Sequence, residues 1–247
     1  MADVRAQPGL WDQTLWLTLS DNGGPVSDRT KGANNYPLRG GKAGNFQGGV
    51  QVVAFASGGL VPPPRRGAVE PGLAHVADLW ATLCGLAGVD AGDARAAAAG
   101  LPPPDSLDLW PLISGANSSS PRAEVPLVDG ATVQGVISGA VAAGRLYKLL
   151  VGRVQSDFRG AAVSPTAATP NSTAFDCGAG CLFELVDDPL EQRDVAAQNP
   201  AVVAQLTARL AAWQAGVFDP DRGAEDPRCC QAVRKLYRGF LGPFVDV

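Results

Sequence analysis

Two adjacent residues near the N-terminus, Asp21 and Asn22, have side chains suited to binding a metal ion. They follow a short apolar run at residues 15–19, which predicts a buried strand. In open α/β sheets, ligands bind beyond the carboxyl ends of the strands, so these side chains would project into such a site. A carboxylate oxygen beside an amide oxygen suits calcium or magnesium. The alternative is a hairpin, because Asn-Gly is a strong hairpin signal, although residues 25–35 offer no second strand.

A second group of candidate residues lies in the glycine-rich segment 34–49, where Arg39 and Lys42 stand three positions apart. A lysine in such a segment can act as a compact point charge for a tetrahedral oxyanion, either sulfate or phosphate. The alternative is a solvated loop in which both cations are ordinary surface charges. Lys42 is therefore a candidate contact to an anionic substrate.

Other titratable residues have structural explanations beside functional ones. His75, the only histidine, stands three residues before Asp78, a spacing that allows contact on a helix, although a structural or exposed histidine is the common case. A single histidine excludes a typical multi-histidine zinc site. Asp187, Asp188 and Glu191 are acid or base candidates, but a proline-containing turn between a strand and a helix also explains them.

The first half of the chain must position these residues with few regular elements. Apolar patterns predict strands over residues 14–20 and 48–57, with a long loop over 21–47 between them. A helix is predicted over 72–88, and a short turn or helix over 106–115. The residues that form the apolar face of this helix are Leu73, Val76, Trp80, Leu83 and Ala87.

The sequence pattern changes to short apolar segments after the linker-like residues 115–122. Four short strands and then one amphipathic helix over 199–214 are predicted, which describes an α+β subdomain. The strands are expected within EVPLVDG, GVISGAVAAG, RLYKLLVG and CLFELVDD. We therefore predict two domains, an α/β part over residues 1–122 and an α+β subdomain over 123–247.

The composition limits the class of protein. Charged residues make up 18% of the 247 residues and the net charge is −4, which argues against a nucleic-acid-binding protein. No apolar run reaches the roughly 18–20 residues that a membrane-spanning helix needs. The first residues include Asp3 and Arg5 and lack the apolar stretch of a secretion signal.

Two features nevertheless point to passage through the secretory pathway. Asn117 and Asn171 each begin an Asn-x-Ser/Thr triplet, which is an acceptor for N-glycosylation. Cys177 and Cys181 are close enough in sequence to pair, and the total of five cysteines leaves at least one unpaired or bonded outside the chain.

Six segments, taken in order along the chain, resemble the sulfatase family and in particular its arylsulfatase B-like branch. LWDQTLWLTLSDNGG resembles the strand that ends in the family's Asp-Asn-Gly metal motif. NNYPLRGGKAGNFQGGV resembles its Pro-Leu-Arg-Gly-x-Lys segment, with Gln47 where an acid usually stands. CLFELVDDPLEQRDVA resembles the C-terminal Leu-Phe-x-Leu-x-x-Asp-Pro-x-Glu signature. The shorter matches are HVADLWATLCGLAGV, in which Ala81 replaces a proline, DSLDLWPLISG and GRLYKLLVG.

The resemblance implies an alkaline-phosphatase-like α/β fold followed by a small antiparallel sheet with a helix. It also implies hydrolysis of sulfate esters, in which a formylglycine hydrate attacks sulfur and calcium neutralises the charge of the sulfuryl group. By position, Asp21 and Asn22 match two of the family's metal ligands, and Lys42 matches the lysine that contacts the sulfate and the leaving oxygen. His75 matches a position outside the reacting centre.

The chain departs from the family at the nucleophile. Within the six matching segments, no cysteine is followed by the x-Pro/Ala-x-Arg sequence from which formylglycine is made. That sequence occurs only as CQAVR, which begins at Cys230 after the C-terminal signature, whereas the resemblance implies a nucleophile upstream of Asp21. We therefore expect the C-terminal portion of a sulfatase, truncated at the N-terminus, with an incomplete calcium site and no activity alone. The alternative is a non-catalytic module derived from a sulfatase that binds sulfated glycans or a partner chain. The full-length protein is expected in the lysosome or outside the cell.

Overall fold

The computed structural model describes residues 1–25, 33–130, 132–155, 174–217 and 228–240. The chain divides into two compact units, residues 1–217 and residues 218–247. The second unit contains helix α7 (Arg228–Lys235). The predicted boundary between residues 122 and 123 falls inside the first unit and stays a prediction. In the described ranges, no helix is long and apolar enough to cross a membrane.

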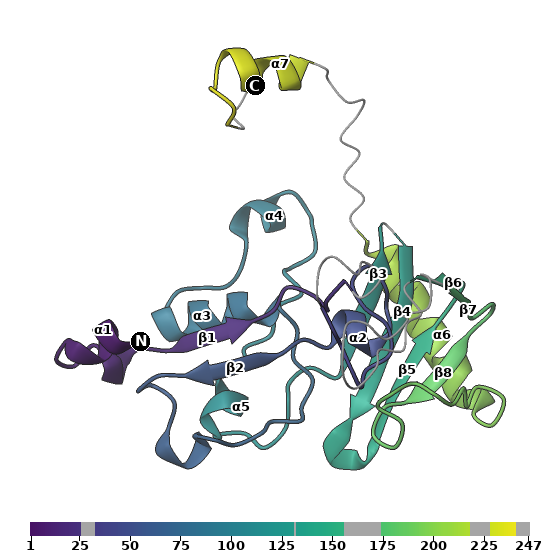
Figure 1. The fold of residues 1–247 in the computed structure, drawn as a ribbon. Coiled ribbons are helices and arrows are strands. Elements are labelled where there is room, and N and C mark those ends of the chain that lie inside the picture. Colours follow the sequence, from purple (N-terminus) through teal and green to yellow (C-terminus); the bar gives the residue numbers. More distant parts are fainter. Residues whose placement is uncertain (26–32, 131, 156–173, 218–227, 241–247) are drawn as a thin grey trace. The chain divides into compact units, whose positions relative to one another are not determined.

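Strand β1 (Trp16–Leu19) confirms the first predicted strand, and it pairs antiparallel with β2 (Ala54–Ser57) (Figure 1). Its predicted burial is wrong, because Trp16 and Leu17 are only half-buried and Leu19 is exposed. The prediction of one strand over residues 48–57 is wrong in its first half, because helix α2 (Gln47–Val50) occupies that part. A Cβ on Gly49 would lie 2.1 Å from the carbonyl oxygen of Gly44. The glycines that looked like part of a strand therefore allow a backbone turn that side chains would block.

The predicted helix over 72–88 is helix α3 (Asp78–Ala87), which ends at Gly88 in the left-handed conformation. Its apolar face is largely exposed: Val76 retains 61% and Trp80 55% of their accessible surface. The buried residues of α3 are instead Asp78 and Thr82, because both bond to the segment at residues 107–109. The other helical elements of this half are α1 (Ala2–Ala6), η1 (Trp11–Gln13), η2 (Pro63–Arg65), α4 (Ala94–Ala98) and α5 (Trp110–Ser114).

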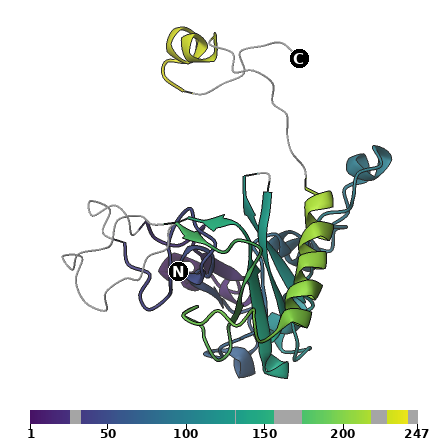
Figure 2. The ribbon, with the colours of Figure 1, turned by 90° about the vertical axis from the view of Figure 1, so that its right-hand side faces the viewer.

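The four strands predicted in the second half are confirmed as one antiparallel sheet in the order β3-β4-β5-β8. Their bounds are Glu124–Asp129, Thr132–Ala140, Arg145–Leu150 and Cys181–Glu184. The predicted helix over 199–214 is α6 (Pro200–Ala215), which begins with proline in its first turn and lies along this sheet (Figure 2). The smaller elements are η3 (Val141–Ala143) and the paired strands β6 (Arg153–Val154) and β7 (Phe175–Asp176).

Both faces of the four-stranded sheet are covered. On one face, Leu149 and Leu182 pack with Leu206 of α6. On the other face, Leu150 and Phe183 pack with Phe46, which belongs to the glycine-rich segment of the first half. Because side chains alternate along a strand, Lys148 of β5 points to the same face as Leu150. The glycine-rich segment therefore shares a hydrophobic core with the C-terminal sheet.

Candidate functional site

The turn that holds Asp21 and Asn22 begins directly after β1. The Asn22 backbone N–H donates to Asp21 Oδ1 over 2.9 Å, and the Ser20 hydroxyl donates to the Asn22 carbonyl over 2.9 Å. Asp21 is exposed and Asn22 is half-buried. The hairpin alternative is wrong, because the partner of β1 in the described residues is β2, more than thirty positions further along the chain.

Backbone hydrogen bonds join this turn to the loop that carries Lys42. The Gly23 N–H donates to the Gly49 carbonyl over 2.9 Å, and the Lys42 N–H donates to the Gly24 carbonyl over 3.1 Å. Asp21 and Asn22, predicted as metal ligands, therefore lie in a segment bonded directly to the loop of Lys42, the predicted sulfate contact. The Lys42 side chain is exposed on this loop.

Asn35 reinforces the junction between the two segments. Its Oδ1 accepts from the Gly24 N–H over 2.8 Å, and its Nδ2 donates to the carbonyls of Gly24 and Gly40 over 2.9 and 3.1 Å. One amide side chain thus satisfies three backbone groups in a region without regular structure. This role has no signal in the sequence, because only the three-dimensional position separates Asn35 from the neighbouring loop asparagine.

The glycines of both segments permit backbones to approach closely. A Cβ on Gly23 would lie 1.7 Å from the Gly48 carbonyl oxygen, and a Cβ on Gly48 would lie 2.4 Å from the Gly40 carbonyl oxygen. Both distances are far below any tolerated contact between these atoms. The glycine-rich composition therefore reflects backbone packing at this junction, in addition to turn formation.

Arg39, which the solvated-loop alternative makes an ordinary surface charge, is buried, so that alternative is wrong for this residue. Its side chain retains only 3% of its accessible surface, and its guanidinium carbon lies 3.8 Å from the centre of the Phe46 ring and 4.6 Å from that of Phe175. Its Nη1 donates to the Glu191 backbone carbonyl over 2.8 Å. The aromatic faces and the carbonyl hold the cation inside the protein, where it joins the loop to the C-terminal sheet.

Lys148, Glu191 and Gln47 form a buried polar cluster beneath the same loop. Lys148 Nζ lies 2.7 Å from Glu191 Oε1 and 3.0 Å from Gln47 Oε1, and both charged side chains are fully buried. The other Glu191 oxygen accepts from the Gln47 backbone N–H over 2.6 Å. Burial lowers the pKa of Lys148, an effect that the facing Glu191 carboxylate opposes. A lysine in the apolar strand RLYKLL was the available sequence signal for such a partner.

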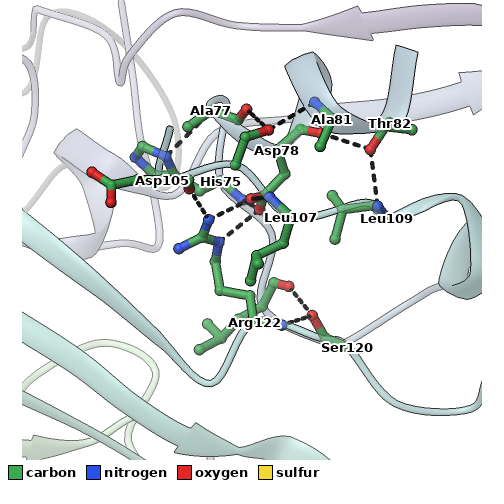
Figure 3. A network of polar contacts seen from close by, with 12 residues as sticks. His75, Ala77, Asp78, Ala81, Thr82, Asp105, Leu107, Leu109, Ser120 and Arg122 are labelled. Atoms are coloured by element: carbon green, nitrogen blue, oxygen red, sulfur yellow. Dashed lines mark hydrogen bonds and ion pairs between the residues drawn. The ribbon is translucent and has the colours of Figure 1, made fainter. Parts of the chain in front are cut away.

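His75 and Asp78 belong to a structural network at the start of α3 (Figure 3). Asp78 Oδ2 accepts from the His75 N–H over 2.8 Å and from Arg122 Nε over 2.7 Å, and the Arg122 Nη2 also bonds to Asp78. His75 Nδ1 accepts from the Ala77 N–H over 3.2 Å. The structural explanation for His75 is therefore confirmed, and the network ties α3 to the segment before β3.

Burial and Arg122 shift the protonation of this network. Burial and the nearby guanidinium lower the pKa of His75 below its ordinary value of 6.5. Burial alone would raise the pKa of Asp78, but hydrogen bonds from Arg122 and from the backbone of His75 and Leu107 outweigh it and lower the pKa below 3.8. The neutral imidazole and the ionised carboxylate are thus the forms that the network favours.

The carboxylates of segment 187–196 have the structural role that the turn explanation predicts. Asp188 Oδ2 accepts from the backbone N–H groups of Gln192 and Arg193, each over 2.8 Å. Glu191 is fully buried and adopts a positive φ of 52°. Asp188 holds the turn through backbone hydrogen bonds and Glu191 forms a buried ion pair with Lys148, so the turn explanation is confirmed for both.

Of the two predicted glycosylation acceptors, Asn117 is exposed and its Oδ1 accepts from the Ser119 N–H over 3.2 Å. Asn171 lies outside the described residues. The structure pairs Cys177 with Cys181, as their spacing allowed.

The oxygen atoms of Asp21 and Asn22 suit calcium in kind, but they are few. Calcium takes six to eight oxygen ligands in proteins. In the parts of the chain that the structure describes, no group of three or more histidine, cysteine or acidic side chains could hold a metal ion. Two such ligands are fewer than a calcium site needs.

Comparisons with known proteins place the chain. No protein-family model matches it. Arylsulfatase J of Mus musculus is 28% identical over 261 residues, and arylsulfatase A of Bos taurus is 30% identical over 241 residues. These alignments cover 96% and 90% of this chain but 40% and 44% of the relatives. The chain thus spans less than half the length of the curated relatives it matches.

Solved structures share the fold. A protein from a Bacteroides thetaiotaomicron locus for the metabolism of multiple glycosaminoglycans matches with a TM-score of 0.60 and 20% identity, over 83% of this chain and 40% of its own. Ps i-CgsB, solved in complex with k-i-k-neocarrahexaose, matches with a TM-score of 0.58 and 19% identity, over 93% and 43%. The fold is thus the mixed α/β fold of the alkaline-phosphatase-like sulfatases, as predicted. The chain belongs to the sulfatase family and corresponds to a C-terminal portion of its members.

Proposed function

We propose that this chain supplies the C-terminal part of a calcium-dependent sulfatase that hydrolyses sulfate esters. The observation that carries the proposal is the junction between two segments: the turn with Asp21 and Asn22 is hydrogen-bonded to the loop with Lys42 through Gly23 and Gly24. A metal ligand pair and a cation for an oxyanion belong side by side in such an enzyme, because metal and lysine must both reach one sulfate group.

In this proposal each of the three residues has a defined task. Asp21 and Asn22 contribute oxygen ligands to calcium, which neutralises charge on the sulfuryl group when bound. Lys42 contacts the sulfate and the leaving oxygen as a compact, exposed cation. The nucleophile, a formylglycine in the family, is expected upstream of Asp21. The one Cys-x-Ala-x-Arg sequence of this chain, CQAVR at Cys230, lies in α7 after the C-terminal signature, and we assign it no role. We therefore expect the 247-residue chain alone to be inactive.

The substrate class that we propose is a sulfated glycan or an aryl sulfate. Support comes from the relatives named arylsulfatase and from the structural neighbours connected by name with glycosaminoglycan metabolism and with a neocarrahexaose. We further propose passage through the secretory pathway to the lysosome or the cell exterior, with Asn117 as an exposed acceptor for glycosylation.

A second candidate is a non-catalytic module that binds sulfated glycans or a partner chain. The observation in its favour is that this chain anchors the Lys42 loop with its own residues, through Asn35, Arg39 and Glu191. A preformed cationic loop of this kind can bind a sulfate group without any nucleophile.

Two measurements test the proposal. The purified chain is assayed with a chromogenic aryl sulfate and calcium, beside Lys42→Ala; we expect equal background rates, and turnover well above that variant would contradict the expected inactivity. The sequence upstream of the coding region is then read: an in-frame Cys/Ser-x-Pro/Ala-x-Arg motif supports the enzyme, whereas a stop codon with its own promoter supports the module.

A further inference from the structure

The loop that carries Lys42 is held at both ends by one residue. At its start, Arg39 Nη1 donates to the Glu191 carbonyl over 2.8 Å. At its end, the Gln47 backbone N–H donates to the Glu191 carboxylate over 2.6 Å. Lys42 lies between these two anchors, on the exposed part of the loop. Glu191 comes from a turn more than 140 positions away in the sequence, so this clamp exists only in the folded chain.

The backbone of Glu191 is shaped for this double contact. Its φ of 52° is in the left-handed region, which is costly for a residue with a Cβ unless the surroundings compensate. In this conformation the carbonyl reaches Arg39 while the side chain reaches Gln47. A glycine would adopt the same φ without strain, but it would lack the carboxylate that holds the end of the loop.

Lys148 offsets the cost of burying the Glu191 carboxylate. A fully buried, unpaired carboxylate carries a large desolvation cost, which a lysine at 2.7 Å compensates. The same ammonium group donates to Gln47 Oε1 over 3.0 Å. Lys148 therefore binds the side chain of Gln47, while Glu191 binds its backbone N–H. The three residues form a closed polar cluster inside an apolar core that contains Phe46 and Leu150.

We propose that Glu191 and Lys148 are positioning residues, which fix the glycine-rich loop 39–49 and thereby place Lys42 beside the turn of Asp21 and Asn22. The effect is transmitted through α2, because its Gly49 carbonyl accepts the Gly23 N–H. The restraint on the loop stands on geometry alone, whereas its consequence for a sulfate contact rests on the proposed function. Neither residue touches the substrate, so neither is catalytic.

The test is residue-level amide hydrogen exchange on the full chain. Glu191→Ala removes the side-chain anchor and leaves Lys148 buried without a counter-charge. We expect exchange of the amides in 39–49, and of Gly23, to rise at least about tenfold more than exchange in α6 and in β4. A residue that contributed only to global stability would raise all three sets by the same factor, and that result would overturn the proposal.

Further variants keep the proposal falsifiable if Glu191→Ala fails to fold. Glu191→Gln combined with Lys148→Met removes both charges and retains an oxygen that can accept the Gln47 N–H. We expect this pair of substitutions to restore amide exchange in residues 39–49 to within about threefold of the wild-type rate. Lys148→Met alone leaves the buried Glu191 carboxylate without a counter-charge, so amide exchange in the loop should stay fast. The matched control is Asp187→Asn in the same turn, an exposed partner of Arg145 at 3.6 Å, which should leave loop exchange unchanged.

Binding of inorganic sulfate separates this inference from the proposed function. Sulfate is titrated while the amide signals of residues 40–44 are followed by NMR. Perturbation at Lys42 that weakens in Glu191→Ala supports both claims. If sulfate does not shift the amide signals of residues 40–44 in the wild-type chain, the proposed function is contradicted. The hydrogen-exchange result still decides the positioning role in that case. Loop exchange that stays at the wild-type level in Glu191→Ala overturns that role, whatever sulfate does.

Discussion

His75 gives the molecule a titration that can be assigned to one side chain, because it is the only histidine. Its pKa is lowered in the folded chain, so the unfolded chain binds more protons between that lowered value and 6.5. The free energy of unfolding must therefore rise with pH through this window and fall on acidification below 6.5. Protonation would also convert Nδ1, which accepts from the Ala77 N–H, into a donor.

We predict that His75→Gln flattens this part of the pH dependence. The free energy of unfolding is measured by urea denaturation at pH values from 5 to 8, for the wild type and the variant. The wild type should lose stability toward pH 5 and the variant should lose less. Identical slopes in the two proteins would show that His75 is not held neutral by its burial and by Arg122.

Asp78 is the anchor of the same network, and its loss should be costly. Asp78→Asn keeps the shape but leaves the buried Arg122 without its counter-charge. Removing one partner of a buried ion pair typically costs about 3–5 kcal/mol. Because the pKa of Asp78 is lowered, its contribution is present above 3.8 and is lost progressively as the pH falls from there through the lowered folded-state pKa. Denaturation at pH 7 and at pH 3 should therefore show a smaller difference between the proteins at pH 3.

The control for Asp78→Asn is an ion pair of similar type at the surface. Arg65 and Glu70 lie 3.0 Å apart with about a quarter of each side chain accessible. Glu70→Gln should cost less than about 1 kcal/mol, because exposed pairs contribute little. A cost for Asp78→Asn as small as that of Glu70→Gln would contradict the role of the network.

At the scale of elements, the loops near Lys42 depend on glycines more than on side chains. Gly23→Ala would place a Cβ 1.7 Å from the Gly48 carbonyl oxygen, so the turn and α2 must separate. We expect a loss of about 3 kcal/mol or more, at the upper end of the range for overpacking. Thermal denaturation measures this loss of stability. Increased hydrogen exchange at the Gly49 and Lys42 amides shows that the destabilised region is the junction of the two segments.

The matched substitution is Gly85→Ala in α3. A Cβ there meets only the Asp108 side chain, Oδ2 at 3.5 Å and Cγ at 3.8 Å, which is ordinary contact, and alanine has the higher helix propensity. We expect a stabilisation of about 0.5–1 kcal/mol. If both substitutions destabilise the chain equally, close approach of the two loops does not explain the glycines.

Elements with a clear apolar period were predictable, and the elements built on glycine were not. The four strands of the C-terminal sheet and α6 follow from their patterns because each buries an apolar face, and β1 follows from its apolar run although none of its residues is buried. Helix α2 was predicted as a strand, since Gly48 and Gly49 carry no periodic signal and their conformation is set by the backbone of residues 39–44. Similarly, α3 has an apolar period, yet it buries Asp78 and Thr82.

The candidate site also has a part that could be predicted from the sequence and a part that could not. The residue types of Asp21, Asn22 and Lys42 could be selected from the sequence, and their roles stay predictions. Their joining through Gly23, Gly24 and Asn35 could not be predicted, because it depends on contacts between distant segments. The charged residues Arg39 and Glu191 were assigned from local context, whereas their positions are decided by packing against aromatic rings and Lys148.

For the whole molecule, the first half of the described chain exposes more apolar surface than the C-terminal sheet. Val53 of the segment before β2 retains 77% of its accessible surface, and Phe55 of β2 and Trp80 of α3 retain about half. Exposed apolar groups of this size favour association with other apolar surfaces. We predict concentration-dependent self-association, measured by sedimentation velocity, which Phe55→Ser reduces and Leu236→Ser in the second unit does not. A chain that stays monomeric at all concentrations would contradict this prediction.

The central claim is that the Asp21–Asn22 turn and the Lys42 loop form one site that carries metal ligands. Manganese, an oxygen-preferring and paramagnetic substitute for calcium, tests it directly, because amide NMR signals near a bound ion broaden selectively. We predict that substoichiometric manganese first broadens the amides of residues 21–24 together with residues 40–49. Asp21→Asn should abolish this and the exposed control Asp12→Asn should not. Selective broadening elsewhere, or of one segment without the other, would contradict the account.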